Sequence, residues 1–90
     1  MAKYDTTTSR HAEALRGAGY LRLEEAFPRL VGKLSSDEQS GLVGFIKSRN
    51  FAALERALRF HVKQQHDVCV DVITVPLPDD RIVVMVRLDG

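Results

Sequence analysis

Three histidines and one cysteine are the side chains of this sequence best suited to bind a transition metal or to act as nucleophiles. They are His11, His61, His66 and Cys69. A metal site on one helix needs ligands three or four residues apart, whereas His61 and His66 are five apart and point in different directions. Cys69 lies between two valines in an expected strand, not at a helix amino terminus where a thiolate is stabilised. We therefore expect no metal centre, no cofactor and a packed, unreactive thiol.

Pairs of adjacent carboxylates are the other candidates for acid–base chemistry. Adjacent side chains on a helix diverge by about 100 degrees, and aspartates are common turn formers in hairpin loops, so such pairs do not converge on a substrate. The sequence also lacks a Gly-rich phosphate loop and a Ser, His and Asp arrangement. We expect a non-enzyme with no small-molecule substrate. The pairs are Glu24 with Glu25, Asp37 with Glu38, and Asp79 with Asp80.

Length and composition are those of one small soluble domain. Of the 90 residues, 44% are hydrophobic and 28% are charged, which is neither the apolar depletion nor the charge excess of a disordered chain. No apolar run is long enough to span a membrane or to form a signal peptide, so the expected location is the cytoplasm. We expect a flexible lead at residues 1–8 and a single domain at residues 9–90.

Four segments carry helical signals. Ser9 or Thr8 caps a short helix that ends near residue 18, and a second helical pattern over residues 23–34 is interrupted by Pro28, which predicts a kink or a break. Ser36 with Gln39 forms a capping box at the start of a third helix.

Asn50 caps the strongest helix of the chain, at residues 51–66. Its apolar stripe is expected to be buried and consists of Phe51, Leu54, Leu58 and Val62, broadened by Ala53, Ala57 and Phe60. In the preceding helix, Gly41 and Gly44 lie one turn apart, a spacing that allows another backbone to approach closely.

The last 24 residues predict an antiparallel β-hairpin with a five-residue loop at residues 76–80. Because side chains alternate along a strand, Val70 and Val72 lie on one aliphatic face, opposite Val86 and Val84 respectively, and this face must pack on the helices. The other face is mixed, but its loop end is apolar. The fold class is therefore α+β, with three to four helices packed on one face of a C-terminal antiparallel β-hairpin.

The second face of the hairpin carries the first functional prediction, which is protein binding. A two-stranded hairpin with open edges and apolar residues on its second face is suited to pairing with another protein or with a second copy of the chain. We expect a regulator, adaptor or inhibitor of a larger assembly that forms a homodimer. The alternative is that the amino-terminal segment covers this face, or that a few apolar side chains stay exposed. The interface residues would be Ile73, Val75, Val83, Met85 and Arg87.

The uneven charge carries the alternative prediction, which is DNA binding. Residues 41–66 contain five basic side chains and one acidic, a net charge of +4, whereas the whole chain carries only +1. Three helices followed by a hairpin resemble the element order of a winged-helix domain, with residues 51–66 as recognition helix. The apolar first turn of that helix and the acidic hairpin loop count against it. The DNA contacts would be Lys47, Arg49, Arg56, Arg59 and Lys63.

Overall fold

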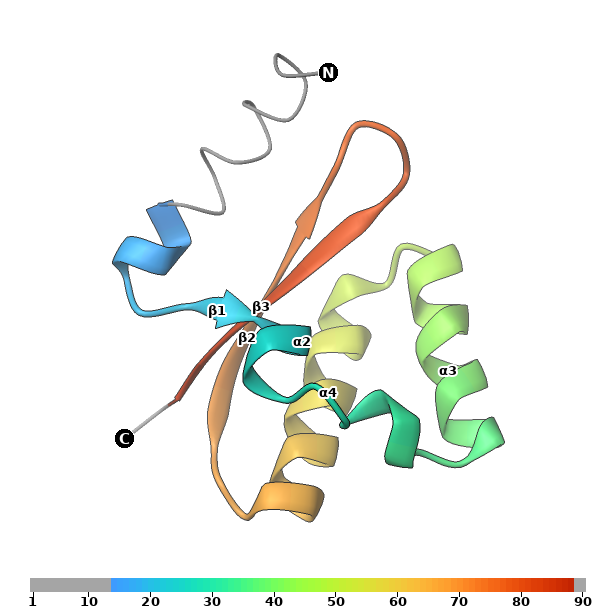
Figure 1. The fold of residues 1–90 in the computed structure, drawn as a ribbon. Coiled ribbons are helices and arrows are strands. Elements are labelled where there is room, and N and C mark those ends of the chain that lie inside the picture. The colour runs from blue at the N-terminus through green and yellow to red at the C-terminus, as the bar shows by residue number, and fades with distance from the viewer. Residues whose placement is uncertain (1–13, 89–90) are drawn as a thin grey trace.

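The framework is a small antiparallel sheet with helices on one face and the first described residues on the other (Figure 1). The computed structural model describes residues 14–88. Residues 14–17 are helical, and the expected helix before them, with its cap, lies outside the described residues. The α+β prediction is confirmed. The elements that follow are β1 (Leu21–Arg22), α2 (Leu23–Ala26), the 3-10 helix η1 (Val31–Lys33), α3 (Ser36–Lys47), α4 (Phe51–His66), β2 (Val70–Pro76) and β3 (Ile82–Leu88).

The helical pattern expected over residues 23–34 is broken, as Pro28 predicted. Helix α2 ends at Ala26, a turn follows at residues 28–30, and the chain resumes as η1. Proline has no N–H for a helical hydrogen bond and disfavours helical geometry in the residue before it, which here is Phe27 with φ −136° and ψ 74°. Leu30 in the turn is fully buried and attaches this segment to the core.

The capping box of α3 lies one residue before the predicted position. Ser35 is the N-cap: its Oγ accepts from the Glu38 N–H at 3.1 Å, while the Glu38 carboxylate accepts from the Ser35 N–H at 2.9 Å. The side-chain amide of Gln39 instead donates to the carbonyls of Val31 and Leu34. A charged acceptor makes the stronger hydrogen bond to the backbone, which is why Glu38 and not Gln39 completes the box.

Helix α4 supports the core on the helical side of the sheet. Asn50 is its N-cap, as predicted, and accepts from the Ala53 N–H at 3.3 Å. The buried side chains of α4 face the apolar side of the hairpin and one face of α3. The fully packed members of this core include Leu54, Leu58, Val62, Val70, Val72 and Val86. No helix within residues 14–88 is long and apolar enough to cross a membrane.

The hairpin has the predicted faces but a different register. Val72 lies opposite Val86, not Val84, so the pairing is shifted by two residues from the prediction. The loop is residues 77–81, closed by a hydrogen bond of 2.8 Å from the Leu77 N–H to the Arg81 carbonyl. Strand β2 continues through Pro76, which needs no N–H partner at a strand end. A shift of two residues leaves every side chain on its predicted face.

A third strand, which the sequence did not predict, lies along one edge of the hairpin. Strand β1 pairs antiparallel with β3, Leu21 opposite Val86 and Arg22 opposite Met85, and gives the order β1-β3-β2. On the other edge, the Glu55 carboxylate of α4 accepts from one N–H of β2, that of Thr74, at 2.9 Å. A two-residue strand is too short to recognise from an alternating pattern.

The two glycines of α3 do not contact another element. A Cβ built on Gly41 or Gly44 would meet nothing within 4 Å, so the close backbone approach that their spacing suggested does not occur. Both residues lie on the exposed side of the helix.

Candidate functional site

The apolar second face of the hairpin is largely covered by the chain itself. Met85 is 0% exposed and Val75 is 4% exposed, and both pack with Tyr20, which precedes β1. Ile73 and Val83 are half-buried at the margin of this second cluster. Tyr20 therefore covers the centre of this face, whereas the amino-terminal residues expected to cover it lie outside the described residues.

Tyr20 is held over the hairpin by polar contacts to both strands. Its hydroxyl donates to the Asp71 carboxylate of β2, and the guanidinium of Arg87 on β3 lies 5.0 Å from the centre of its ring. Asp71 and Arg87 are opposite each other in the register, so one tyrosine bridges both strands. Gly19 allows this close approach, since its φ of 96° is a left-handed conformation and a Cβ there would lie 3.3 Å from Arg87.

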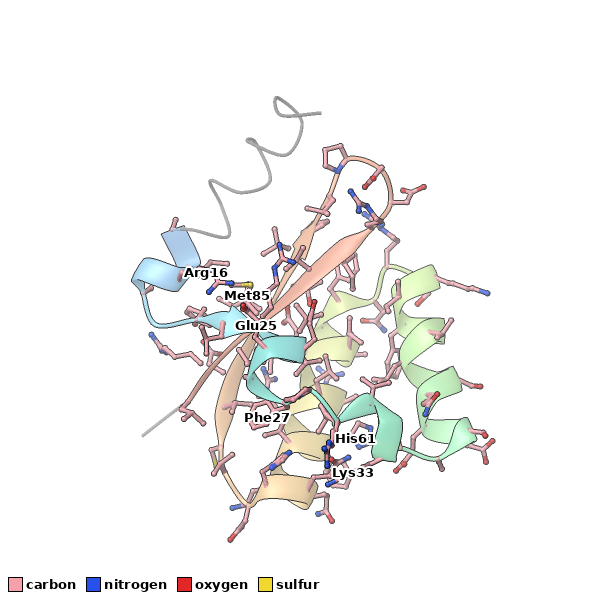
Figure 2. The ribbon with its side chains drawn as sticks, viewed as in Figure 1. Arg16, Glu25, Phe27, Lys33, His61 and Met85 are labelled. Atoms are coloured by element: carbon pink, nitrogen blue, oxygen red, sulfur yellow. The ribbon has the colours of Figure 1, made fainter. Side chains whose placement is uncertain are left out.

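A second set of contacts ties the same segment to α2. Arg16 donates to the Glu25 carboxylate at 2.6 Å, and the other donor to that oxygen is the Arg22 N–H at 3.1 Å. The Arg16 hydrogen bond lowers the pKa of Glu25 below its usual value, with the Arg22 N–H as the next cause. Figure 2 shows Arg16 and Glu25, the two side chains of this ion pair. A partner that binds the centre of the predicted hairpin interface, at Val75 and Met85, would have to displace Tyr20.

The residues considered for metal or nucleophile chemistry lie apart. His61 is buried in α4, whereas His66 is exposed and its ring lies 4.8 Å from that of Phe27. Cys69 was expected to be packed within a strand, but it precedes β2 and is exposed. Within residues 14–88 no three His, Cys, Asp or Glu side chains converge as metal ligands would. His11 lies outside the described residues.

The outer face of α4 presents an exposed aromatic ring among basic side chains. Phe60 was predicted to widen the buried stripe, but it is 56% exposed, because α4 turns Leu54, Leu58 and Val62 to the core and Phe60 lies beyond their edge. The neighbouring positions on the same helix face are Arg56, one turn before, and Lys63, nearly one turn after. We call the set Arg56, Arg59, Phe60, Lys63 and Gln64 the Phe60 surface.

A hollow of about 290 Å³ adjoins the Phe60 surface where α4 faces η1 and α3. Figure 2 shows two of its residues, Lys33 and His61, beside each other. Glu38 also lines the hollow. The hydrogen bond that its carboxylate accepts from the Ser35 N–H lowers the pKa of Glu38, and His61 is a smaller cause. Gln65 anchors the α4 side by donating to the Leu30 carbonyl at 3.0 Å. The residues that line the hollow are Lys33, Leu34, Glu38, Phe60, His61, Gln64 and Gln65.

The remaining predicted DNA contacts lie near the turn between α3 and α4. Arg49 has the left-handed φ of 61°, lies 5.0 Å from the ring centre of Phe51 and makes a 3.9 Å ion pair with Asp80 in the hairpin loop. Lys47 is exposed at the end of α3. The acidic loop therefore lies beside this pair of cations, whereas Arg56 and Arg59 make no ion pair within residues 14–88.

Comparison with known proteins gives no relative: the chain matches no protein-family model, no curated protein and no solved structure. The sequence placed the basic residues of the Phe60 surface on one helix, but it did not indicate that an aromatic side chain is exposed among them. A closer count of the helical period would have shown Phe60 at the edge of the apolar stripe.

Proposed function

We propose that this chain is a small non-enzymatic protein-binding module, of the kind that regulates, links or inhibits larger assemblies, and that it binds through the Phe60 surface. The observation that carries the proposal is the exposure of Phe60 between Arg56 and Lys63 on one helix. Aromatic residues and arginine are enriched at protein interfaces and dominate their binding energy. Aromatic side chains bury large areas, and arginine makes directed hydrogen bonds. The adjoining hollow gives this surface the concave relief that a partner side chain can fill.

A photo-crosslinking experiment tests this function directly. Benzoylphenylalanine in place of Phe60 is expected to give a discrete protein adduct in an extract of the source cells, and Arg56→Glu in the same chain should suppress it. The matched control places the crosslinker at Val43, which is 46% exposed on α3 and lies outside the Phe60 surface. Adducts at Val43 that equal those at Phe60 would contradict the proposal.

Self-association through the hairpin is a separate part of the proposal. Its support is the half-buried pair Ile73 and Val83 at the margin of the covered face, and it requires that Tyr20 moves aside or that pairing uses this margin alone. Light scattering at micromolar concentration measures it: a mass of 10.1 kDa that Val83→Glu does not change would rule it out.

DNA binding is the second candidate, because Arg56, Arg59 and Lys63 line one face of α4. Binding of random duplex DNA, followed by fluorescence anisotropy, would weaken steeply with salt, and Arg56→Ala would reduce that dependence. The acidic residues Asp79 and Asp80 lie in the hairpin loop that a wing would bring to the phosphates. Absence of binding at low salt would exclude this candidate.

A further inference from the structure

We infer that the partner of the Phe60 surface presents a short acidic segment with an apolar side chain among its carboxylates. This inference rests on the proposed function and names the chemistry of the partner. The segment's apolar side chain packs against Phe60 at the hollow, and its carboxylates meet Arg56 and Arg59 on one side and Lys63 on the other.

Charge complementarity supports an acidic occupant. Arg56 and Arg59 make no ion pair within residues 14–88, so their charge is directed to solvent or to a partner. Lys63 has a partner in Asp67 at 3.1 Å, which raises the pKa of Lys63 and keeps it protonated, but both side chains are exposed and free to exchange partners. The one acidic side chain of α4, Glu55, is turned away to the Thr74 N–H. The outer face of the helix is therefore positive without compensation from its own carboxylate.

The apolar component follows from Phe60 and its surroundings. The ring lies against His61, with 5.6 Å between the ring centres, and forms one wall of the hollow together with Leu34. A partner with carboxylates alone would leave the exposed part of this ring in water, whereas an apolar side chain packed on it removes that surface from water. A leucine or phenylalanine in the segment would gain from the same contact.

The length of the surface favours a peptide over a nucleic acid. Arg56 and Lys63 are seven residues apart, which is about 10 Å along a helix. An acidic group lies near each end of this stretch: Glu38 lies across the hollow, and Asp67 follows the end of α4. DNA carries a phosphate about every 3.4 Å along each strand, so a duplex would extend past the cations toward these carboxylates. A peptide of a few residues fits between them.

Selection from a random peptide library displayed on phage tests the inference with the full chain as target. We expect enriched peptides to contain aspartate or glutamate together with leucine or an aromatic residue. Phe60→Ala should weaken a selected peptide about 30-fold, the effect of a hot-spot residue, and Arg56→Ala about two- to fivefold, the effect of one exposed charge. The control Val43→Ala, on the exposed side of α3, should leave the affinity unchanged.

The outcomes separate the inference from the function on which it rests. Enriched peptides without acidic residues, or peptides whose affinity Phe60→Ala does not change, would overturn the inference. Tighter binding of single-stranded or duplex oligonucleotides than of the selected peptides would also overturn it, in favour of a nucleic-acid partner. If crosslinking at Phe60 still captures a protein while the selected peptides are not acidic, the function stands and only the partner chemistry is wrong.

Discussion

Tyr20 covers the apolar second face of the hairpin. Its replacement measures how much this contact contributes to the free energy of unfolding. Tyr20→Phe keeps the ring over Met85 and removes only the hydroxyl that donates to Asp71. A hydrogen bond to a charged group is worth about 1.5–3 kcal/mol, and because Asp71 is half-buried and regains some water, the lower end applies. We expect Tyr20→Phe to lower the free energy of unfolding by about 1–2 kcal/mol.

Tyr20→Ala adds the loss of the ring itself. Truncating a buried aromatic side chain costs about 3–5 kcal/mol, and here it also exposes Met85 and leaves the Arg87 guanidinium without its aromatic contact. A domain of 90 residues has a total stability of about 5–13 kcal/mol. Tyr20→Ala should therefore remove a large part of the free energy of unfolding, and the variant should begin to unfold at low urea concentration.

Urea denaturation followed by circular dichroism is the assay for both variants. With a slope of about 1 kcal/mol per molar urea for a domain of this size, Tyr20→Phe should move the midpoint down by about 1–2 M. The control is Leu21→Ala, since Leu21 is the next residue but is exposed, and its midpoint should change far less. Free energies of unfolding of Tyr20→Phe and Tyr20→Ala that both lie within about 0.5 kcal/mol of the parent chain would show that Tyr20 does not stabilise the fold.

Three further predictions concern single residues. Gly44→Ala should stabilise the domain by about 0.5–1 kcal/mol in the same urea assay, because alanine has the higher helix propensity and its methyl group meets no neighbour. A loss of stability would mean that the methyl group clashes with a neighbour, contrary to the structure. Glu55→Ala should cost about 1–3 kcal/mol by leaving the Thr74 N–H without its acceptor, whereas Glu55→Gln keeps an acceptor and should cost less; equal losses would mean that the hydrogen bond is unimportant. The pKa of Glu38 is lowered from its usual 4.5, mainly by the Ser35 N–H, so its contribution is present above pH 4.5 and is lost as the pH falls through the folded-state value. Stability measured against pH should therefore fall more steeply in the parent chain than in Glu38→Gln, and identical acid limbs would refute this.

Local signals in the sequence predicted most of the helical side of the fold. The break at Pro28 and the cap at Asn50 follow from backbone chemistry within a few residues, and the alternation in the hairpin fixed which residues face the helices. The capping box moved by one residue because Ser35 and Ser36 are adjacent and both have an acceptor three positions on. Such ambiguities are settled by the stronger acceptor, which sequence spacing alone does not rank.

The parts that the sequence did not predict depend on contacts between distant residues. Register is one, because a shift of two residues preserves both faces and only the strand end at Pro76 distinguishes the alternatives. The position of Tyr20 over the second face of the hairpin is another, since Tyr20 and Asp71 are 51 residues apart and nothing near Tyr20 in the sequence marks it as buried. The candidate site falls between these cases: its cations were predicted, but the exposure of Phe60 depends on how α4 is rotated against the sheet.

Tyr20 and Phe60 show how this small chain uses its few aromatic side chains. A domain of this size buries only about 60–65% of its unfolded surface, so each large apolar side chain withheld from the core is a considerable loss of stability. Tyr20 lies in a connecting segment and is nevertheless buried, where it closes the second face of the hairpin. Phe60 lies in α4, the helix that contributes Leu54, Leu58 and Val62 to the core, and is nevertheless 56% exposed. A polar residue at position 60 would serve the helix as well, and burial of Phe60 against a partner, as proposed above, would recover the apolar surface that folding leaves in water.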